Sequence, residues 1–368
     1  MNKNLKQTIL ISGSRAPIAL ELARSFKLQG HRVIMMDCQS WTIARWSNCI
    51  DRYYIIASPR FNNASFVIDI QEIIKKENID HFIPTCEEAI FVAAHCDEFN
   101  CKVWTSDKDL VIGLHNKFLF SQNYRNILPM PKTVMLKDFS DWENSEQYVF
   151  KPIYSRFASF VVINKKISKD FFEEEDQDQW IAQKLVRGKE ICVYSIWSEG
   201  KMKAYSAYHP LFRAGKGSGV FFEPVQNKEI FELVNNFGQD LHYMGQMCFD
   251  VILDEQARPF FIECNPRGTS GAHLINVQLA NAFLGNELIV NNDTKDFSIK
   301  YAMAMLHPFS FFKKRVRQSQ DIIFKWHDSK PFFLQILSLI EISSIKIWRR
   351  CTWLEATTAD IEWNGHES

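Results

Sequence analysis

Three oxygen-bearing side chains lie close together in the segment FDVILDEQARPFFIECNPRG, which predicts two strands joined by a turn. Because side chains alternate across a strand, Glu263 and Asn265 point to the same face, and the hairpin folds Asp250 back beside them. Two carboxylates and an amide oxygen suit Mg²⁺ or Mn²⁺. A structural hairpin with a charged outer face is disfavoured, because Glu263 lies in a nearly continuous apolar run where an unpaired carboxylate is costly. The segment therefore predicts a divalent-metal site.

The first hundred residues predict a scaffold for such a site. Short apolar runs alternate with amphipathic runs of helical spacing, and this order is typical of a doubly wound parallel sheet. Glu87 lies two residues after the fourth run, at the carboxyl end of the sheet, where ligands of open α/β sheets bind. It is a candidate substrate contact, with a favourable helix N-terminal position as the alternative. The predicted strands are 8–12, 31–37, 51–57, 80–85 and 101–106.

Two further patterns are informative. The turn GSRAPIA after the first strand lacks the glycines of a dinucleotide-binding G-x-G-x-x-G motif, which argues against nicotinamide binding. From about residue 131 the signals become strand-rich, with one hairpin turn at Glu199–Gly200 and one helix near 228–245. The acidic run 171–180 predicts a solvated helix or loop.

Composition limits the class of protein. The 368 residues carry 43 basic and 43 acidic side chains, and zero net charge argues against broad nucleic-acid binding. The nine cysteines are odd in number and no pair has C-x-x-C spacing, so we expect reduced thiols in a cytoplasmic protein. The N-terminus has no signal-peptide pattern. The apolar segment 331–348 is interrupted by charged and serine residues, which favours a core or partner-facing helix over a membrane span.

Several motifs in order resemble the ATP-grasp superfamily. The most specific is ECNPR at 263–267, which an acid precedes by thirteen residues. HNKFLF carries Lys117, VFKP carries Lys151, and AQKLVRGKE has the spacing of the family's hinge. Together they cover about residues 107–285. The NPR ending is closer to carbamoyl-phosphate-synthase-like and biotin-carboxylase-like ligases than to D-alanine–D-alanine ligases.

The resemblance implies that ATP binds between two lobes, with Lys117 and Lys151 on its phosphates. A lysine supplies a point charge without requiring bidentate geometry. The hinge runs from Gln183 to Val186, and the backbone groups of Lys184 and Val186 would face the adenine edge. Glu190 matches the carboxylate that accepts hydrogen bonds from the ribose hydroxyls.

The phosphate loop departs from the family pattern. Relatives usually have a glycine-rich loop after the second lysine, whose backbone amides hold phosphate. Here the loop is IYSRFASF, without glycine. Arg156 is therefore a candidate to supply charge in place of those amides.

Basic residues near the hairpin complete the predicted site. Arg267, two residues after Asn265, can stabilise the charge that develops in phosphoryl transfer. Residues 208–224 contain three glycines and are interpreted as a mobile loop over the active site. In it, Arg213 is a candidate to neutralise an acyl phosphate or bind a substrate carboxylate, and His209 is assigned to the substrate. A solvated loop without chemistry is the alternative.

The resemblance implies an ATP-dependent ligase that converts a carboxylate to an acyl phosphate, joins it to an amine and releases ADP and phosphate. The cofactors would be ATP and Mg²⁺ or Mn²⁺, and the partners a small-molecule carboxylate and an amine. The alternatives are a kinase that stops at a phosphorylated product and, given the unusual phosphate loop, a protein that binds ATP without turnover.

The expected fold combines α/β and α+β parts, ending in a mixed C-terminal extension. The extension pairs apolar runs with basic ends. We expect it to pack on the core; a homodimer is possible and membrane association is the least favoured fate. The expected domains are a Rossmann-like pre-ATP-grasp domain at 1–106, a small lobe at 107–180, a large lobe at 181–290 and the extension at 291–368.

Overall fold

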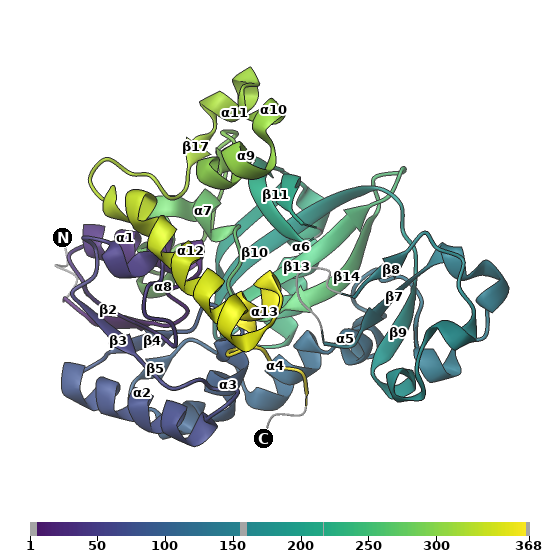
Figure 1. The fold of residues 1–368 in the computed structure, drawn as a ribbon, viewed down its shortest axis with the longest axis horizontal. Coiled ribbons are helices and arrows are strands. Elements are labelled where there is room, and N and C mark those ends of the chain that lie inside the picture. The colour runs from purple at the N-terminus through teal and green to yellow at the C-terminus, as the bar shows by residue number, and fades with distance from the viewer. Residues whose placement is uncertain (1–5, 155–159, 216, 366–368) are drawn as a thin grey trace.

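The computed structural model describes residues 6–154, 160–215 and 217–365, which form three β-sheets (Figure 1). The N-terminal sheet is parallel, with strand order β3-β2-β1-β4-β5, so the predicted doubly wound sheet is confirmed. Its odd and even residues pack into two separate cores, because Ile9 and Ile11 face one layer of helices and Leu10 faces the other. The strands are β1 (Thr8–Ile11), β2 (Arg32–Asp37), β3 (Arg52–Ile55), β4 (His81–Ile83) and β5 (Lys102–Val103).

The N-terminal helices begin at clear sequence signals. Pro17 occupies the first turn of its helix, where its missing N–H costs nothing, and Asn62 accepts a hydrogen bond from the backbone N–H of Ser65. Gly13 forms the turn before the first helix with φ of +68°, and a Cβ there would lie 2.5 Å from Thr85 Oγ1. The helices are α1 (Pro17–Leu28), α2 (Asn63–Glu77) and α3 (Glu88–Ala94).

A small antiparallel sheet follows, with strand order β6-β9-β7-β8. Asn116 caps the second of the two helices that lead into it, accepting hydrogen bonds from the backbone N–H groups of Phe118 and Leu119. This cap makes Lys117 the first helical residue. The elements are α4 (Lys108–His115), α5 (Lys117–Tyr124), β6 (Thr133–Met135), β7 (Tyr148–Pro152), β8 (Val162–Ile163) and β9 (Trp180–Lys184).

The third sheet is the largest, with order β14-β13-β10-β11-β12-β16-β17 and β15 beside β11. The predicted hairpin turn is confirmed: Glu199 and Gly200 join β10 to β11 with φ of +51° and +74°. The strands are β10 (Lys189–Ser198), β11 (Lys201–Ala214), β12 (Ser218–Pro224), β13 (Gly245–Leu253), β14 (Pro259–Asn265), β15 (Ile289–Val290), β16 (Phe297–Ser298) and β17 (Gln320–Asp321).

The prediction of a mobile loop at 208–224 is wrong for the described residues. They form the paired ends of β11 and β12, with Arg213 opposite Gly219 and His209 opposite Glu223. The reason is burial: Phe221 and Phe222 are fully buried, so their strand is anchored in the core. The glycines serve only the hairpin end.

The C-terminal extension divides into two parts. The first adds β16 and β17 to the large sheet. The second crosses in front of the N-terminal domain as α12 and α13 (Figure 1). Core packing is confirmed for its last residues, since Ile361 and Trp363 are buried, but wrong for α12, whose most apolar window is only 11% buried. The remaining helices are α6 (Lys228–Asp240), α7 (Ala272–Ile275), α8 (Leu279–Leu284), α9 (Lys300–Leu306), α10 (Pro308–Phe311), α11 (Lys314–Gln318), α12 (Lys330–Arg349) and α13 (Trp353–Thr358).

Short 3₁₀ turns connect these elements. The acidic run predicted as a solvated helix or loop contains one of them, η6, and the last residue of another, η5. They are η1 (Ala44–Trp46), η2 (Cys96–Glu98), η3 (Leu136–Asp138), η4 (Trp142–Gln147), η5 (Lys169–Phe171), η6 (Glu174–Asp178) and η7 (Asn276–Gln278).

Candidate active site

A cavity of about 630 Å³ receives residues from the small and large sheets, from loops and α1 of the N-terminal domain, and from the C-terminal segment. Apolar side chains of the small sheet, including Val149 and Ile163, form one part of its wall. Charged residues of β10, β13 and β14 form a second part. Residues 15–18 of the N-terminal domain form a third, together with Thr357 and Thr358. The cavity is thus large enough for a ligand of nucleotide size.

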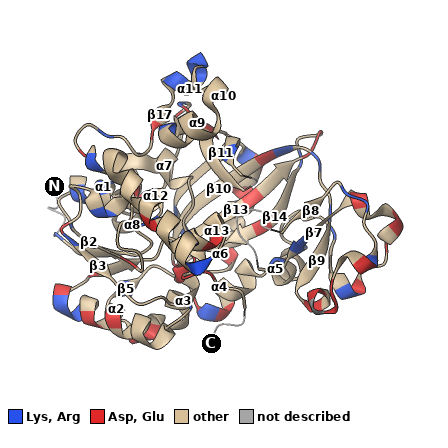
Figure 2. Cartoon of the chain, in the orientation of Figure 1, with Lys and Arg blue, Asp and Glu red and all other residues tan. Residues whose placement is uncertain are grey.

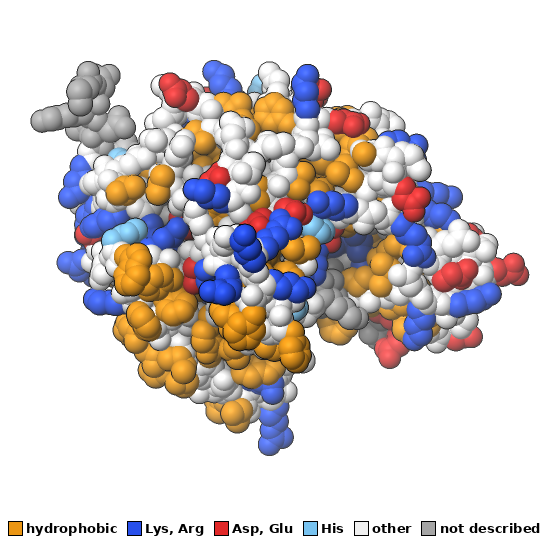
Figure 3. All heavy atoms as spheres, turned by 90° about the horizontal axis from the view of Figure 1, so that it is seen from above, with side chains coloured by type: hydrophobic (Ala, Val, Ile, Leu, Met, Phe, Trp, Pro, Cys, Tyr) orange, Lys and Arg blue, Asp and Glu red, His pale blue; other side chains and the backbone are white. Residues whose placement is uncertain are grey.

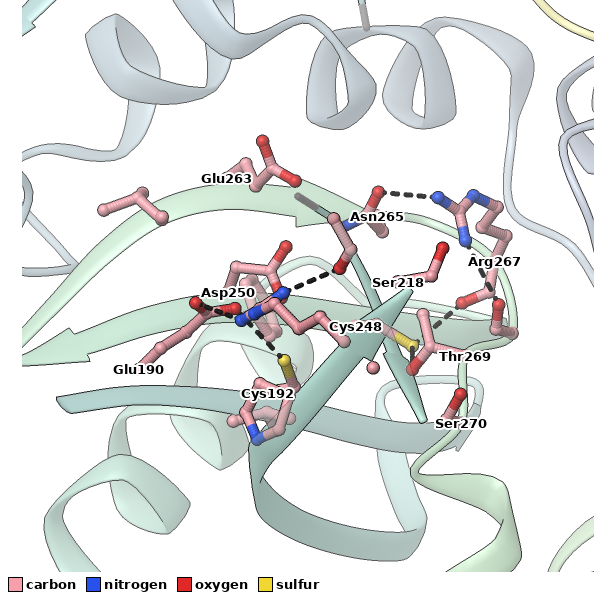
Figure 4. A pocket seen from close by; sticks show the side chains of 18 of the residues that line it. Glu190, Cys192, Ser218, Cys248, Asp250, Glu263, Asn265, Arg267, Thr269 and Ser270 are labelled. Atoms are coloured by element: carbon pink, nitrogen blue, oxygen red, sulfur yellow. Dashed lines mark hydrogen bonds and ion pairs between the residues drawn. The ribbon is translucent and has the colours of Figure 1, made fainter. Parts of the chain in front are cut away.

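The predicted metal ligands meet on two adjacent strands of this wall (Figure 4). Asp250 on β13 lies directly opposite Glu263 on β14, and Asn265 follows on the same face of β14. All three line the cavity. The side chain of Glu263 is 23% exposed, because it faces the cavity, whereas Cys264 between the two ligands points into the core. The alternation argument from the sequence thus describes the hairpin correctly.

Two buried lysines approach Glu263. Lys117 Nζ and Lys151 Nζ each lie 3.8 Å from Glu263 Oε2, and their side chains are 4% and 6% exposed. Lys151 lines the cavity, whereas Lys117 is not among the described residues that do. The two lysines predicted from separate motifs therefore meet at one carboxylate.

The charges around this pair shift three pKa values. Burial raises the pKa of Glu263, but Lys117 and Lys151 outweigh burial and hold it at about 2. Burial, and then the neighbouring Glu263, raise the pKa of Asp250 well above its usual value. Burial lowers the pKa of Lys151 to about 8. A dication between the two carboxylates would relieve the repulsion at Asp250, so this all-oxygen donor set fits Mg²⁺ or Mn²⁺.

A second cluster lies beside Asp250. Glu190 and Cys192 share one face of β10, Cys192 is in register with Asp250, and the ligand atoms of these three lie within 4.8 Å of one another. Arg213 forms an ion pair with Glu190 and donates a hydrogen bond to the carbonyl oxygen of Gly217 at 2.7 Å. The candidate ribose carboxylate and the candidate phosphate arginine are therefore neighbours.

Arg267 lies on the other side of the metal ligands. Its Nη2 donates to Asn265 Oδ1 at 3.1 Å, and its Nε lies 3.7 Å from Glu87 Oε1 (Figure 4 shows the first contact). Glu87 is fully buried and is not among the described residues that line the cavity. The acid predicted as a substrate contact therefore orients Arg267 from behind.

The remaining predicted residues differ in their access to the cavity. Gln183 lines it and donates to Thr133 Oγ1 at 3.0 Å. Lys184 and Val186 also line it. His209 is hydrogen-bonded through Nδ1 to the carbonyl oxygen of Glu190 at 2.8 Å, and it is absent from the described lining. Arg156 lies outside the described residues.

The sequence did not single out two parts of the wall. The first is Cys192, which lies two residues after Glu190 on a strand and so shares its face, a spacing that could have indicated it. The second part joins Arg15 to the C-terminal segment: Arg15 donates to Asp360 Oδ1 and Oδ2 at 2.6 and 2.7 Å and to the carbonyl oxygen of Thr357 at 2.8 Å. No motif marks these residues.

Comparison with known proteins supports the motif assignment. Residues 114–271 match the family model of the ATP-grasp domain. No curated protein matches the chain.

Solved structures share the fold at low sequence identity. The ADP complex of N5-carboxyaminoimidazole ribonucleotide synthetase has 14% identity and a TM-score of 0.62, and the match covers 95% of this chain and 99% of that one. N5-carboxyaminoimidazole synthetase from Staphylococcus aureus has 15% identity and a TM-score of 0.61, and the match covers 80% of this chain and 83% of that one. L-amino acid ligase from Bacillus licheniformis has 16% identity and a TM-score of 0.58, and the match covers 77% of this chain and 75% of that one. Residues 114–271 therefore match the ATP-grasp domain, and the chain shares the overall fold of these three proteins.

Proposed function

We propose that this protein is an ADP-forming ligase that joins a carboxylate to an amine through an acyl phosphate. The observation that carries the proposal is the opposed pair Asp250 and Glu263, with Lys151 and Arg267 beside it, on the wall of a cavity in an ATP-grasp domain. Two proteins that share the fold support this class of reaction: N5-carboxyaminoimidazole synthetase from Staphylococcus aureus, solved in complex with ADP, and L-amino acid ligase from Bacillus licheniformis.

In the first step, an oxygen of the substrate carboxylate attacks the γ-phosphorus of ATP. The bond to the β,γ-bridging oxygen breaks, and ADP leaves. Asp250, Glu263 and Asn265 would hold Mg²⁺ or Mn²⁺, which when bound neutralises charge on the phosphate oxygens. Lys151, when protonated, and Arg267 contribute positive charge at the same place, and Lys117 helps keep Glu263 ionised.

In the second step, the amine attacks the acyl carbon, phosphate leaves and the amine loses a proton. We assign the organic substrates to the part of the wall that residues 15–18 share with Thr357 and Thr358, because the C-terminal segment covers this part and helps to exclude water. Glu190 is assigned to the ribose, and Arg213 is placed between Glu190 and the phosphates. The backbone groups of Lys184 and Val186 are assigned to the adenine.

The proposal is tested by measuring ADP release with pools of small carboxylates, in the presence and absence of amines. A ligase releases ADP with a suitable pair and yields a product with the mass of the condensed acid and amine. A phosphorylated product that is insensitive to amines would identify a kinase. Binding of ATP without ADP release for any pair would favour a non-catalytic ATP-binding protein.

Nucleotide affinity is expected to depend on pH through Lys151. Its pKa of about 8 means that the ammonium that attracts phosphate is present below pH 8 and is lost above it. We expect the dissociation constant for ADP to rise as pH increases above 8, by up to about tenfold per pH unit. Calorimetric titration between pH 7 and 9.5 measures this. The Lys151→Arg variant, whose side chain stays charged, should show a flat profile; an equally steep profile would exclude Lys151 as the titrating group.

A further inference from the structure

Helix α12 carries an apolar face that no other part of the described chain covers. Phe333, Ile336, Ile340 and Ile347 are 65%, 52%, 48% and 76% exposed. Their spacing of three, four and seven residues places them on one side of the helix. In the described residues, α12 is the one helix that is long and apolar enough by length and composition to cross a membrane. Such a continuous patch indicates an interaction surface.

The opposite side of α12 is fixed to the N-terminal domain. Glu341 accepts hydrogen bonds from the backbone N–H groups of Ser40 at 2.8 Å and Trp41 at 2.6 Å, and Ser338 donates to the carbonyl oxygen of Trp41. Beyond the helix, the chain returns to the cavity, where Asp360 pairs with Arg15. These contacts hold the helix flat against the protein, so its free face is suited to lie on a surface and not to span a bilayer.

Exposed cations stand at both ends of this face. Lys330 is at the first helical residue, and Arg349 and Arg350 are at the other end. Further exposed lysines, Lys313 and Lys314, precede the helix in and beside α11, where Figure 2 shows blue ribbon. Figure 3 shows apolar side chains gathered on the side of the molecule where α12 lies, with Lys and Arg side chains around them.

The acidic residues between 305 and 350 do not offset these cations on the surface. Asp328 is fully buried and accepts from Arg24 Nε at 2.8 Å. Asp321 accepts from the backbone N–H of Ile323 at 3.0 Å, and Glu341 faces residues 40–41. All three are turned inward, so the exposed face combines apolar side chains with net positive charge.

This charge pattern distinguishes two possible occupants. In a two-fold contact between copies of α12, antiparallel helices would place Lys330 of one copy near Arg349 and Arg350 of the other, and parallel helices would place like ends together. Either arrangement sets cation against cation. An anionic lipid surface offers acyl chains for the apolar strip and phosphates for both basic ends.

We propose that α12 docks this protein on an anionic membrane surface. The helix lies in the plane of the interface, with Phe333, Ile336, Ile340 and Ile347 at the acyl-chain boundary and the basic ends at the headgroups. This revises the expectation from the sequence that membrane association is the least favoured fate, because core packing, the favoured fate, does not hold for this helix.

Flotation of the full chain with vesicles tests the apolar part of the proposal. We expect binding to vesicles of phosphatidylcholine and phosphatidylglycerol, and at least about tenfold weaker binding to phosphatidylcholine alone. The double variant Ile336→Glu with Ile340→Glu should lose at least about tenfold in affinity. The matched control is Ile55→Glu with Ile68→Glu, two residues that are 55% and 53% exposed on the N-terminal domain, and it should bind normally.

The charged part is tested with Lys330→Glu and Arg350→Glu together, against the exposed control pair Lys75→Glu and Lys76→Glu on α2. We expect about a tenfold loss for the first pair and little change for the second. Equal effects of the two pairs, or absence of binding by the unaltered chain, would overturn the proposal. So would light scattering that shows a dimer which the change at Ile336 and Ile340 dissociates.

Discussion

In the Asp250→Asn variant, ADP formation should fall about a thousandfold while the temperature of unfolding measured without metal stays unchanged. Asp250 faces Glu263 across two strands, and burial together with that carboxylate raises its pKa well above the usual value. An amide has nearly the shape of the protonated acid that this environment favours, so the fold loses little. The metal, however, loses a charged ligand at the place where phosphate charge develops.

The matched variant Glu263→Gln should lose as much activity and also unfold at a lower temperature. Lys117 and Lys151 are both buried and both lie 3.8 Å from Glu263 Oε2, so the change leaves two ammonium groups without that carboxylate. Breaking a buried ion pair costs roughly 3 kcal/mol, which corresponds to a fall of about 4 °C in a chain of this size. Calorimetry and an ADP-release assay measure the two effects. ADP formation at the unaltered rate in either variant, at saturating Mg²⁺, would contradict the metal assignment.

Local patterns were sufficient to predict most of the fold. The five N-terminal strands were predicted from short apolar runs, separated by segments whose apolar residues have helical spacing. Strands of a parallel sheet that is buried on both faces are continuous apolar runs of this kind. The segment 208–224 shows where such patterns fail. Its glycines predicted a loop, but Phe221 and Phe222 are anchored in the core, and tertiary burial outweighs local propensity there.

The candidate site could be predicted where its residues are close in sequence or share a strand. Asp250, Glu263 and Asn265 belong to one hairpin, so strand alternation places them together. Glu87 was interpreted as a substrate contact because position at a strand end cannot distinguish a residue that faces the ligand from one that supports Arg267. The contact of Arg15 with the C-terminal segment joins residues more than 340 positions apart, which no local pattern can indicate.

Replacing Arg15 by methionine should destabilise the protein and loosen the C-terminal segment. Arg15 lies between two acids: its Nε donates to Asp37 Oδ1 at 3.0 Å, and its terminal nitrogens donate to Asp360. The Arg15 side chain is 10% exposed and that of Asp37 is 1% exposed. Without the guanidinium, two poorly solvated carboxylates face each other, at a cost of roughly 3–5 kcal/mol. Calorimetry should record the loss, and limited proteolysis should show faster cleavage between α12 and α13.

The control for this change is Lys27→Met, which removes the ion pair with Asp51 at 2.7 Å. Those side chains are 36% and 32% exposed, so the pair is largely solvated and its loss should cost less than about 1 kcal/mol. Adding Asp360→Asn to Arg15→Met should recover part of the lost stability, because it removes one of the two opposed charges. If Arg15→Met unfolds at the same temperature as the control, the ion pairs do not hold the segment. The Arg15→Met variant should also bind the organic substrates more weakly, while its affinity for ADP stays unchanged. The reason is that only the part of the cavity near Thr357 loses its cover.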